Sequence, residues 1–318
     1  MEIKTKRPKF LIASPPQFWG GPVVLHLLCR MLSDLGYDAK IFMLRTDVRY
    51  PLSRQECLRQ YLPFMNGGKA PELPNSQEGS VKGCVITNWP YVDDDTIVVY
   101  PEVIFGNPLA AKHVVRWFLN VNRFKGEIYA SQAYGKDDLF ICYHQKFNDS
   151  ILNPSGRQVR LLHFNHDVYK RTNYGHREGS CFIIRKGQNR ADLPSSVPGI
   201  IIDDLSEEEK VEVMNKCKYC YSYDTQTLYA TVAAVCGCIS IVVTEPGKRR
   251  EDYLDGDEKA WGVAYGDSPE EIEFACRTQK ELNEWLDSFK ASNQENVQKF
   301  LDYCKEYFQG RMSTDIIW

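Results

Sequence analysis

Hydrophobic positions along the first half of the chain follow two spacings. Short apolar runs suit buried strands, and between them apolar residues recur at the spacing of a helix with one buried face. The pattern predicts strands over residues 10–14, 39–43 and 96–100, and helices over about 22–35 and 109–119. Strands that alternate with helices in this way typically form mainly parallel sheets.

The second half of the chain repeats the alternation. It predicts strands over residues 139–143, 181–184, 200–202, 219–222 and 239–243, with helices over about 207–216 and after Asp224. Beyond Pro269 the pattern is helical, with a break near Ser292 and no later strand. We therefore expect an α/β fold of two Rossmann-like domains whose parallel sheets face each other across a cleft.

The domain boundary is expected where loop-like residues interrupt the strand pattern, between residues 130 and 156. An N-terminal Rossmann-like domain then covers residues 1–145, and a C-terminal one covers residues 146–290. The last segment, residues 291–318, has no strand to follow it. Its helix is therefore expected to pack back on the N-terminal domain.

Composition agrees with a globular protein of this size. The chain has 318 residues, of which 43% are hydrophobic and 25% charged, with a formal net charge of -3. This balance argues against a nucleic-acid partner. A basic cluster (Lys4, Lys6, Arg7, Lys9) suits either a solvated lead-in to the first strand or a contact with an anionic bilayer. With neither a spanning apolar run nor a signal peptide, we expect a soluble, cytoplasmic protein.

Eleven cysteines raise the question of a metal site. Cys217 and Cys220 have CxxC spacing, and Cys236 and Cys238 follow them. A zinc site would need all four thiolates to converge, but the later pair falls where a helix ends and a strand begins. Reduced thiols in the core are therefore the favoured interpretation.

Acidic clusters are the other possible sign of a metal, because an Asp-x-Asp pair binds divalent ions in many transferases. Residues 93–95 precede a strand and are interpreted as a turn. Asp203 and Asp204 lead into a predicted helix with Ser206 as its N-cap and glutamates in its first turn. The sequence thus predicts no metal.

Candidate chemistry is expected at turns that follow strands, because ligands of open parallel sheets bind outside the carboxyl ends of the strands. The turn after residues 219–222 carries Tyr223, Asp224, Thr225 and Thr227 and leads into a helix. The N–H groups and dipole at a helix N-terminus favour bound phosphate. The alternative is that Asp224 or Thr225 only caps the helix.

Two turns in the first half are further candidates. Residues 15–21 include Gly20 and Gly21, which either let a substrate approach the backbone or simply form a turn. Residues 101–108 include Glu102 and Asn107, whose side chains either meet a ligand or are solvated or capping.

Several common signatures are missing from the chain. No GxGxxG follows a strand, no GxxxxGK[ST] occurs, no Tyr is followed four residues later by Lys, and no GxSxG is present. These absences disfavour a dinucleotide-dependent oxidoreductase, a P-loop enzyme, a common type of sugar-nucleotide epimerase and a hydrolase. The expectation that remains is a cleft of nucleotide size between two domains, without the residues for redox or hydrolytic chemistry.

The segment VAAVCGCISIVV resembles the donor-binding helix and strand of bacterial glycosyltransferases of the GT-B fold. With Gly237 as the shared glycine, Asp224 falls at the first acid of that family's two-glutamate motif. The second acid, which normally holds the ribose, falls on Val232. The segments VVYPEVIFGNPLAAKHVVRWFLN, YSYDTQTLY and AWGVAYG resemble a subgroup encoded in capsule and O-antigen loci.

This resemblance implies a GT-B-like glycosyltransferase. It would move a sugar from a nucleoside-diphosphate sugar to a glycan or a lipid-linked oligosaccharide in surface polysaccharide synthesis, at the inner face of the membrane and without a metal or other cofactor. The diphosphate would lie near Thr225 and Thr227, with the cations Arg185 and Lys186 at the end of a neighbouring strand. The alternative is that Arg185 and Lys186 are plain surface charges. Asp224, beside Tyr223, would face the donor sugar, cap the helix, or do both.

An inverting enzyme also needs a base for the acceptor hydroxyl. Glu102 is the first candidate, followed by His144, His163 and His166, while Gly20, Gly21 and Asn107 are assigned to the acceptor side. In a retaining enzyme Glu102 would only bind the acceptor. The alternatives are a non-catalytic sugar- or nucleotide-binding or assembly protein of the same fold, and another nucleotide-sugar enzyme such as an epimerase.

Overall fold

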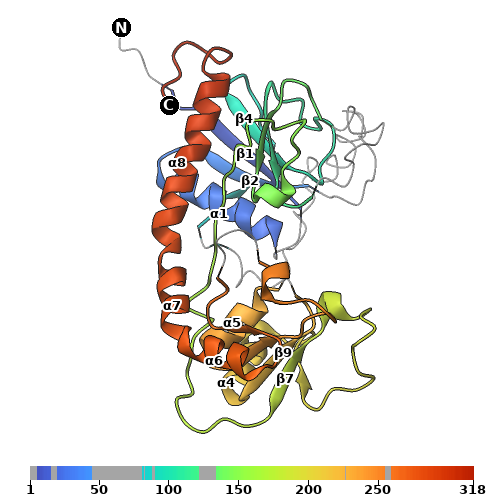
Figure 1. The fold of residues 1–318 in the computed structure, drawn as a ribbon. Helices are drawn as coiled ribbons and strands as arrows, with labels where there is room; N and C mark the ends of the chain where they lie inside the picture. Colours follow the sequence, from blue (N-terminus) through green and yellow to red (C-terminus); the bar gives the residue numbers. More distant parts are fainter. Residues whose placement is uncertain are drawn as a thin grey trace. The chain divides into compact units, whose positions relative to one another are not determined.

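A computed structural model of the chain describes residues 6–15, 20–44, 81, 83–87, 90–121, 134–225, 227–254 and 259–318. These residues form two compact units, drawn in Figure 1. Unit 1 comprises Met1–His163 and Phe289–Trp318, and unit 2 comprises Phe164–Ser288. No helix among the described residues is both long enough and apolar enough to cross a membrane.

Unit 1 is built on a parallel sheet with the order β3-β2-β1-β4-β5-β6, which is the Rossmann strand order. Its strands are β1 Lys9–Ser14, β2 Ala39–Met43, β3 Ile86–Thr87, β4 Thr96–Pro101, β5 His113–Phe118 and β6 Leu139–Cys142. The helices among the described residues of unit 1 are α1 Gly21–Asp34, the short η2 Gln145–Phe147 and α8 Phe289–Phe308.

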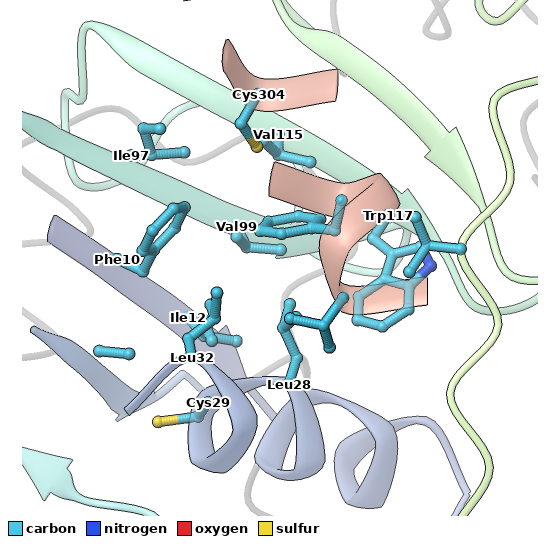
Figure 2. Close-up of a cluster of buried hydrophobic side chains, with 14 of the residues drawn as sticks. Phe10, Ile12, Leu28, Cys29, Leu32, Ile97, Val99, Val115, Trp117 and Cys304 are labelled. Atoms are coloured by element: carbon cyan, nitrogen blue, oxygen red, sulfur yellow. The ribbon is translucent and has the colours of Figure 1, made fainter. Parts of the chain in front are cut away.

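The core of unit 1 lies between one face of this sheet and two helices. Strand residues such as Phe10, Val99 and Trp117 lie in one buried cluster with Leu28 of α1 and Cys304 of α8 (Figure 2). Each large side chain that is fully buried there stabilises the fold by about 1.5–3 kcal/mol. The apolar stripe of α8 therefore fixes the C-terminal helix on unit 1, beside α1.

One predicted element of unit 1 is wrong. Residues 109–119 were expected to form a helix, but β5 occupies His113–Phe118 and all six of its residues are buried. A strand buried on both faces is a continuous apolar run, and such a run also satisfies the spacing of a helix. The chain therefore passes from β4 to β5 through the loop 102–112 without a helix.

Unit 2 holds a second parallel sheet, in the order β11-β10-β9-β7-β8. Counted along the unit this order is 2-1-3-4-5, as in flavodoxin-like folds. The strands are β7 Ser180–Ile183, β8 Ile200–Ile201, β9 Tyr219–Ser222, β10 Ile239–Val242 and β11 Val263–Tyr265. The helices are η3 Arg185–Gly187, α4 Glu207–Lys216, α5 Tyr229–Cys236, η4 Arg250–Asp252, α6 Pro269–Arg277 and α7 Gln279–Asp287.

Local sequence signals explain where the helices of unit 2 begin and end. Ser206 caps α4 through a capping box with Glu209, as the sequence predicted. Gly237 ends α5 with a left-handed backbone at φ 97°. The final helices are interrupted at Thr278 and Ser288, whereas the sequence predicted a break near Ser292.

The chain leaves unit 1 later than the predicted boundary at 145/146. Val159 and Leu161 are buried in the unit 1 core, and Leu162 exchanges two backbone hydrogen bonds with the side chain of Asn293 on α8, at 2.8 and 2.7 Å. This segment has no regular secondary structure, so its packing leaves no hydrophobic period in the sequence. The two parallel sheets nevertheless confirm the prediction of two Rossmann-like domains, and α8 packs on unit 1 as predicted.

Candidate functional site

The topology of unit 2 places its candidate site between β7 and β9. Strand order reverses between these two neighbouring strands, and ligands of open α/β sheets bind outside the carboxyl ends at such a point. Arg185 and Lys186 follow β7, and Tyr223 and Asp224 follow β9. The fold thus brings together two groups of predicted residues that are far apart in the sequence. We call this region, residues 184–190 with 223–225 and 227–229, the β7–β9 edge.

Gly187 shows how closely the two chain segments approach at the β7–β9 edge. A Cβ atom at Gly187 would lie 2.4 Å from the carbonyl oxygen of Tyr223, a distance that real contacts do not reach. The Tyr223 N–H also donates to the carbonyl of Ile183 at 2.8 Å. Only glycine fits this position, and the sequence analysis did not single it out.

Asp203 has a role that the sequence did not reveal. Its Oδ2 accepts hydrogen bonds from the backbone N–H groups of Ile184 and Arg185, at 2.9 and 2.8 Å. Arg185 has a positive φ of 33°, and the two hydrogen bonds hold this uncommon backbone in place. Asp203 therefore shapes the end of β7, while the start of α4 depends on Ser206.

Arg185 lies next to the start of α5. Its guanidinium carbon is 5.4 Å from the centre of the Tyr229 ring, and Tyr229 is the first residue of that helix. Both Arg185 and Lys186 are exposed. A cation and a helix N-terminus thus lie side by side at the carboxyl edge of the sheet, which is a suitable arrangement for binding an anion.

The turn that was predicted to bind phosphate differs from the prediction in one respect. The helix begins at Tyr229, so its first turn lies beyond Thr225 and Thr227. The Thr227 hydroxyl accepts a hydrogen bond from the Tyr229 N–H at 3.2 Å. The Thr227 hydroxyl thus takes up the first N–H of the helix, although the N-cap residue is Leu228. The N–H groups expected to face a ligand belong to the first turn of α5. Gln226 lies outside the described residues.

Asp224 lies deep at the end of β9. The residue is only 3% exposed, and its carbonyl accepts a hydrogen bond from the Ser222 hydroxyl at 2.8 Å. Val232, which takes the position of the resembling family's second acid, is buried in α5. The protein therefore covers most of Asp224, and Val232 provides no acid in place of the family's second one.

Arg190 is a residue of this region that the sequence analysis missed. Its guanidinium donates to the carbonyls of Tyr223, Val243 and Thr244 at 3.2, 2.7 and 3.1 Å, and so ties together the carboxyl ends of β9 and β10. A hydrogen bond from Arg190 to Asp192 raises the pKa of the arginine. No local motif indicates such a role, because the three carbonyls come from distant segments.

In unit 1 the strand order reverses between β1 and β4, so the corresponding edge carries Glu102 after β4 and Gly20 after β1. Glu102 Oε2 accepts a hydrogen bond from the Leu119 N–H at 2.9 Å, and the Tyr134 hydroxyl donates to the Glu102 carbonyl at 3.0 Å. The carboxylate therefore has a fixed orientation at the carboxyl end of the sheet.

Arg116 supports the loop that carries Glu102. This fully buried arginine of β5 donates to Asp138 Oδ2 at 2.7 Å, to the Ile104 carbonyl at 2.8 Å and to the Gly106 carbonyl. The sequence analysis missed Arg116 because its segment was interpreted as a helix.

The remaining candidates of unit 1 have structural roles in the chain. Asn107 closes its own loop, since its side chain bonds both the N–H and the carbonyl of Ala111, at 3.0 and 2.8 Å. Gly20 has a φ of 66° that favours glycine, and Gly21 begins α1. His144 Nδ1 accepts the Lys146 N–H at 3.2 Å and caps the short helix η2. His144 follows β6, the edge strand of the sheet.

The cysteines come closer together than the sequence suggested. β9 and β10 are neighbours in the sheet, and Cys238 Sγ lies 3.4 Å from the Cys217 carbonyl oxygen. The Cys238 thiol also donates to the Met214 carbonyl at 2.9 Å, and the Cys181 thiol donates to the Tyr219 carbonyl at 3.7 Å. Cys217, Cys220, Cys236 and Cys238 are all buried free thiols. Within the described residues, no three His, Cys, Asp or Glu side chains form a group that could hold a metal ion.

No family model and no curated protein sequence matches the chain. Among solved structures it is similar to the glycotransferase of kitacinnamycin, with 8% identity, coverage of 97% of this chain and 100% of that chain, and a TM-score of 0.42. It is also similar to MurG of Acinetobacter baumannii, with 11% identity, 95% coverage of both chains and a TM-score of 0.33. Similarity at this level does not identify a family.

Proposed function

We propose that this chain is a glycosyltransferase that uses a nucleoside-diphosphate sugar as donor. The observation that carries the proposal is the position of Arg185 beside the first turn of α5, at the point where the strand order of unit 2 reverses. A diphosphate is a strong anion, and a guanidinium together with a helix N-terminus suits both its charge and its oxygen atoms.

In the proposed reaction, the anomeric carbon of the donor sugar forms a bond to the acceptor oxygen, and its bond to the diphosphate oxygen breaks. Negative charge then grows on the leaving diphosphate. Positive groups already in place, here Arg185, the exposed Lys186 and the α5 dipole, stabilise that charge without a metal ion. Tyr223 and Thr225 are assigned to the same donor site.

Unit 1 supplies the proposed acceptor side. Glu102 is the candidate base that takes the proton of the acceptor hydroxyl in an inverting reaction, and its bond from the Leu119 N–H keeps one carboxylate oxygen in a defined position. We assign Gly20, Gly21 and His144 to the surroundings of the acceptor, and a glycan or lipid-linked oligosaccharide as the acceptor itself. The finer proposal, from the resemblance, is surface polysaccharide synthesis in the cytoplasm at the inner face of the membrane.

Binding of nucleotides is the first test. Thermal unfolding would be recorded with UDP, GDP, CDP, TDP and ADP, because a ligand that binds only the folded state raises the unfolding temperature. At least one nucleotide is expected to stabilise the protein, and its sugar derivative should be consumed with an acceptor. Failure of all five would contradict the proposal, and binding without any transfer would favour a non-catalytic nucleotide-binding protein.

A further inference from the structure

Tyr229 occupies an unusual position at the β7–β9 edge. The Arg185 guanidinium carbon lies 5.4 Å from its ring centre and the Lys210 ammonium nitrogen lies 5.0 Å from it. A cation over an aromatic face is attracted by the negative charge density of the ring. Arg185 is exposed, so this contact limits the positions of a long and otherwise mobile side chain.

The Tyr229 ring is itself held in place from α4. Its hydroxyl donates to Glu207 Oε1 at 2.5 Å. The same carboxylate accepts a hydrogen bond from the Tyr169 hydroxyl at 2.7 Å and one from the Lys210 ammonium at 2.9 Å. Three donors from three separate segments therefore fix Glu207, and Glu207 fixes the tilt of the Tyr229 ring.

The charge of Glu207 suits this role. Burial alone would raise the pKa of its carboxyl, but the hydrogen bonds from Tyr229, Tyr169 and Lys210 outweigh burial and lower the pKa. The group is thus a carboxylate at neutral pH. Burial and the bond to Glu207 also raise the pKa of Tyr229, so its hydroxyl keeps the proton that it donates.

We propose that Tyr229 is a positioning residue for Arg185, and that Glu207 in turn orients Tyr229, so that the guanidinium is preset to receive the diphosphate of the donor. This inference rests on the proposed function and deepens it. An arginine that is ordered before binding loses less conformational entropy when it meets the ligand, and the affinity rises accordingly.

The test uses the full chain and the nucleoside diphosphate that stabilises the wild-type protein most strongly. Its affinity would be measured by calorimetry for Y229L, Y229F, R185Q and the double variant R185Q/Y229L. Y229L removes the ring, and we expect about two- to fivefold weaker binding, as for the loss of one exposed cation–π contact. Y229F keeps the ring and loses only the bond to Glu207, so a smaller loss is expected.

A coupled pair gives a non-additive result, which a merely structural role would not produce. We expect that R185Q/Y229L binds no more weakly than R185Q alone. The matched control is Y219L, because Tyr219 also lies beside a cation, Lys218 at 5.1 Å, but at the amino end of β9. Y219L should lower the unfolding temperature while leaving the affinity unchanged. If Y229L does not fold, Y229F and E207Q replace it, and the affinity of each is compared with that of its double variant with R185Q.

Two outcomes would contradict the proposals, and they can be told apart. If the wild-type chain binds none of the five nucleotides, the proposed function fails and this inference fails with it. If the wild-type chain binds but Y229L binds equally well, or if the losses from R185Q and Y229L add, the positioning role of Tyr229 fails alone.

Discussion

Arg116 and Asp138 form an ion pair at 2.7 Å inside unit 1, and the arginine side chain is fully buried. The Gly135 N–H also donates to Asp138 Oδ2 at 2.9 Å, while Arg116 lies 4.7 Å from the Tyr100 ring centre. The pair therefore links β5 with the start of β6 and with the loop after β4. Removing one partner would leave a buried charge without its counter-charge.

We accordingly expect R116M to lower the free energy of unfolding by about 3–5 kcal/mol, as for other broken buried pairs. Urea unfolding would measure the loss. The control is K299A, which removes the exposed pair of Lys299 with Glu295 on α8 and should cost no more than about 0.5 kcal/mol. The double variant R116M/D138L should recover part of the loss, because it leaves no buried charge. Equal losses in R116M and K299A would contradict this account.

Replacement of Glu102 tests the candidate base. E102Q keeps an oxygen that can accept the Leu119 N–H, so the fold and the binding of nucleoside diphosphate to unit 2 should be unchanged. If Glu102 is the base, turnover should fall by about 10²–10⁴-fold. Steady-state kinetics with the cognate donor would measure the change. Unchanged turnover would remove Glu102 as base.

Stability should depend on pH through His26. This histidine is buried in α1, and its burial lowers the pKa of the imidazole from 6.5 to about 4. As the pH falls from 6.5 towards 4, the unfolded chain takes up a proton that the folded chain does not. The free energy of unfolding is therefore at its full value above pH 6.5. It declines as the pH falls towards 4, by about 3 kcal/mol in total.

Unfolding in urea at several pH values would measure this decline. H26L has no group to titrate at this position, so its stability should fall less steeply between pH 6.5 and 4 than that of the wild-type chain. If both proteins lose stability with the same slope, His26 does not titrate on unfolding in this range.

Substitution of Gly187 tests the close approach at the β7–β9 edge. A Cβ atom there would overlap the Tyr223 carbonyl, so G187A must displace the backbone at the end of β7 or β9. We expect a loss of about 1–3 kcal/mol, as for other overpacked sites, together with weaker nucleotide binding. G175A is the control, because a Cβ atom at Gly175 would meet its nearest neighbour at 3.4 Å, an ordinary contact. Equal behaviour of the two variants would contradict the close approach.

Hydrophobic spacing was sufficient for most elements of this fold. The strands around residues 10–14, 96–100, 139–143, 181–184 and 219–222 and the helix over 207–216 are where the pattern predicted them, because each has one or two buried faces. The pattern failed at residues 113–118, where a strand buried on both faces has no period of its own. It also missed the end of unit 1, because that end depends on packing in an irregular segment.

For the candidate site too, the sequence predicted some features and only the tertiary structure showed the others. The sequence by itself placed Glu102, Arg185 and the turn around Asp224 after strands, and parallel topology then required these residues to lie at the carboxyl edges of the sheets. The partners of these residues were decided only by the tertiary structure: Asp203 for the end of β7, Arg190 for the ends of β9 and β10, and Tyr229 for the Arg185 guanidinium. The reason is physical, since each contact joins groups from distant segments, and short-range spacing carries no information about them.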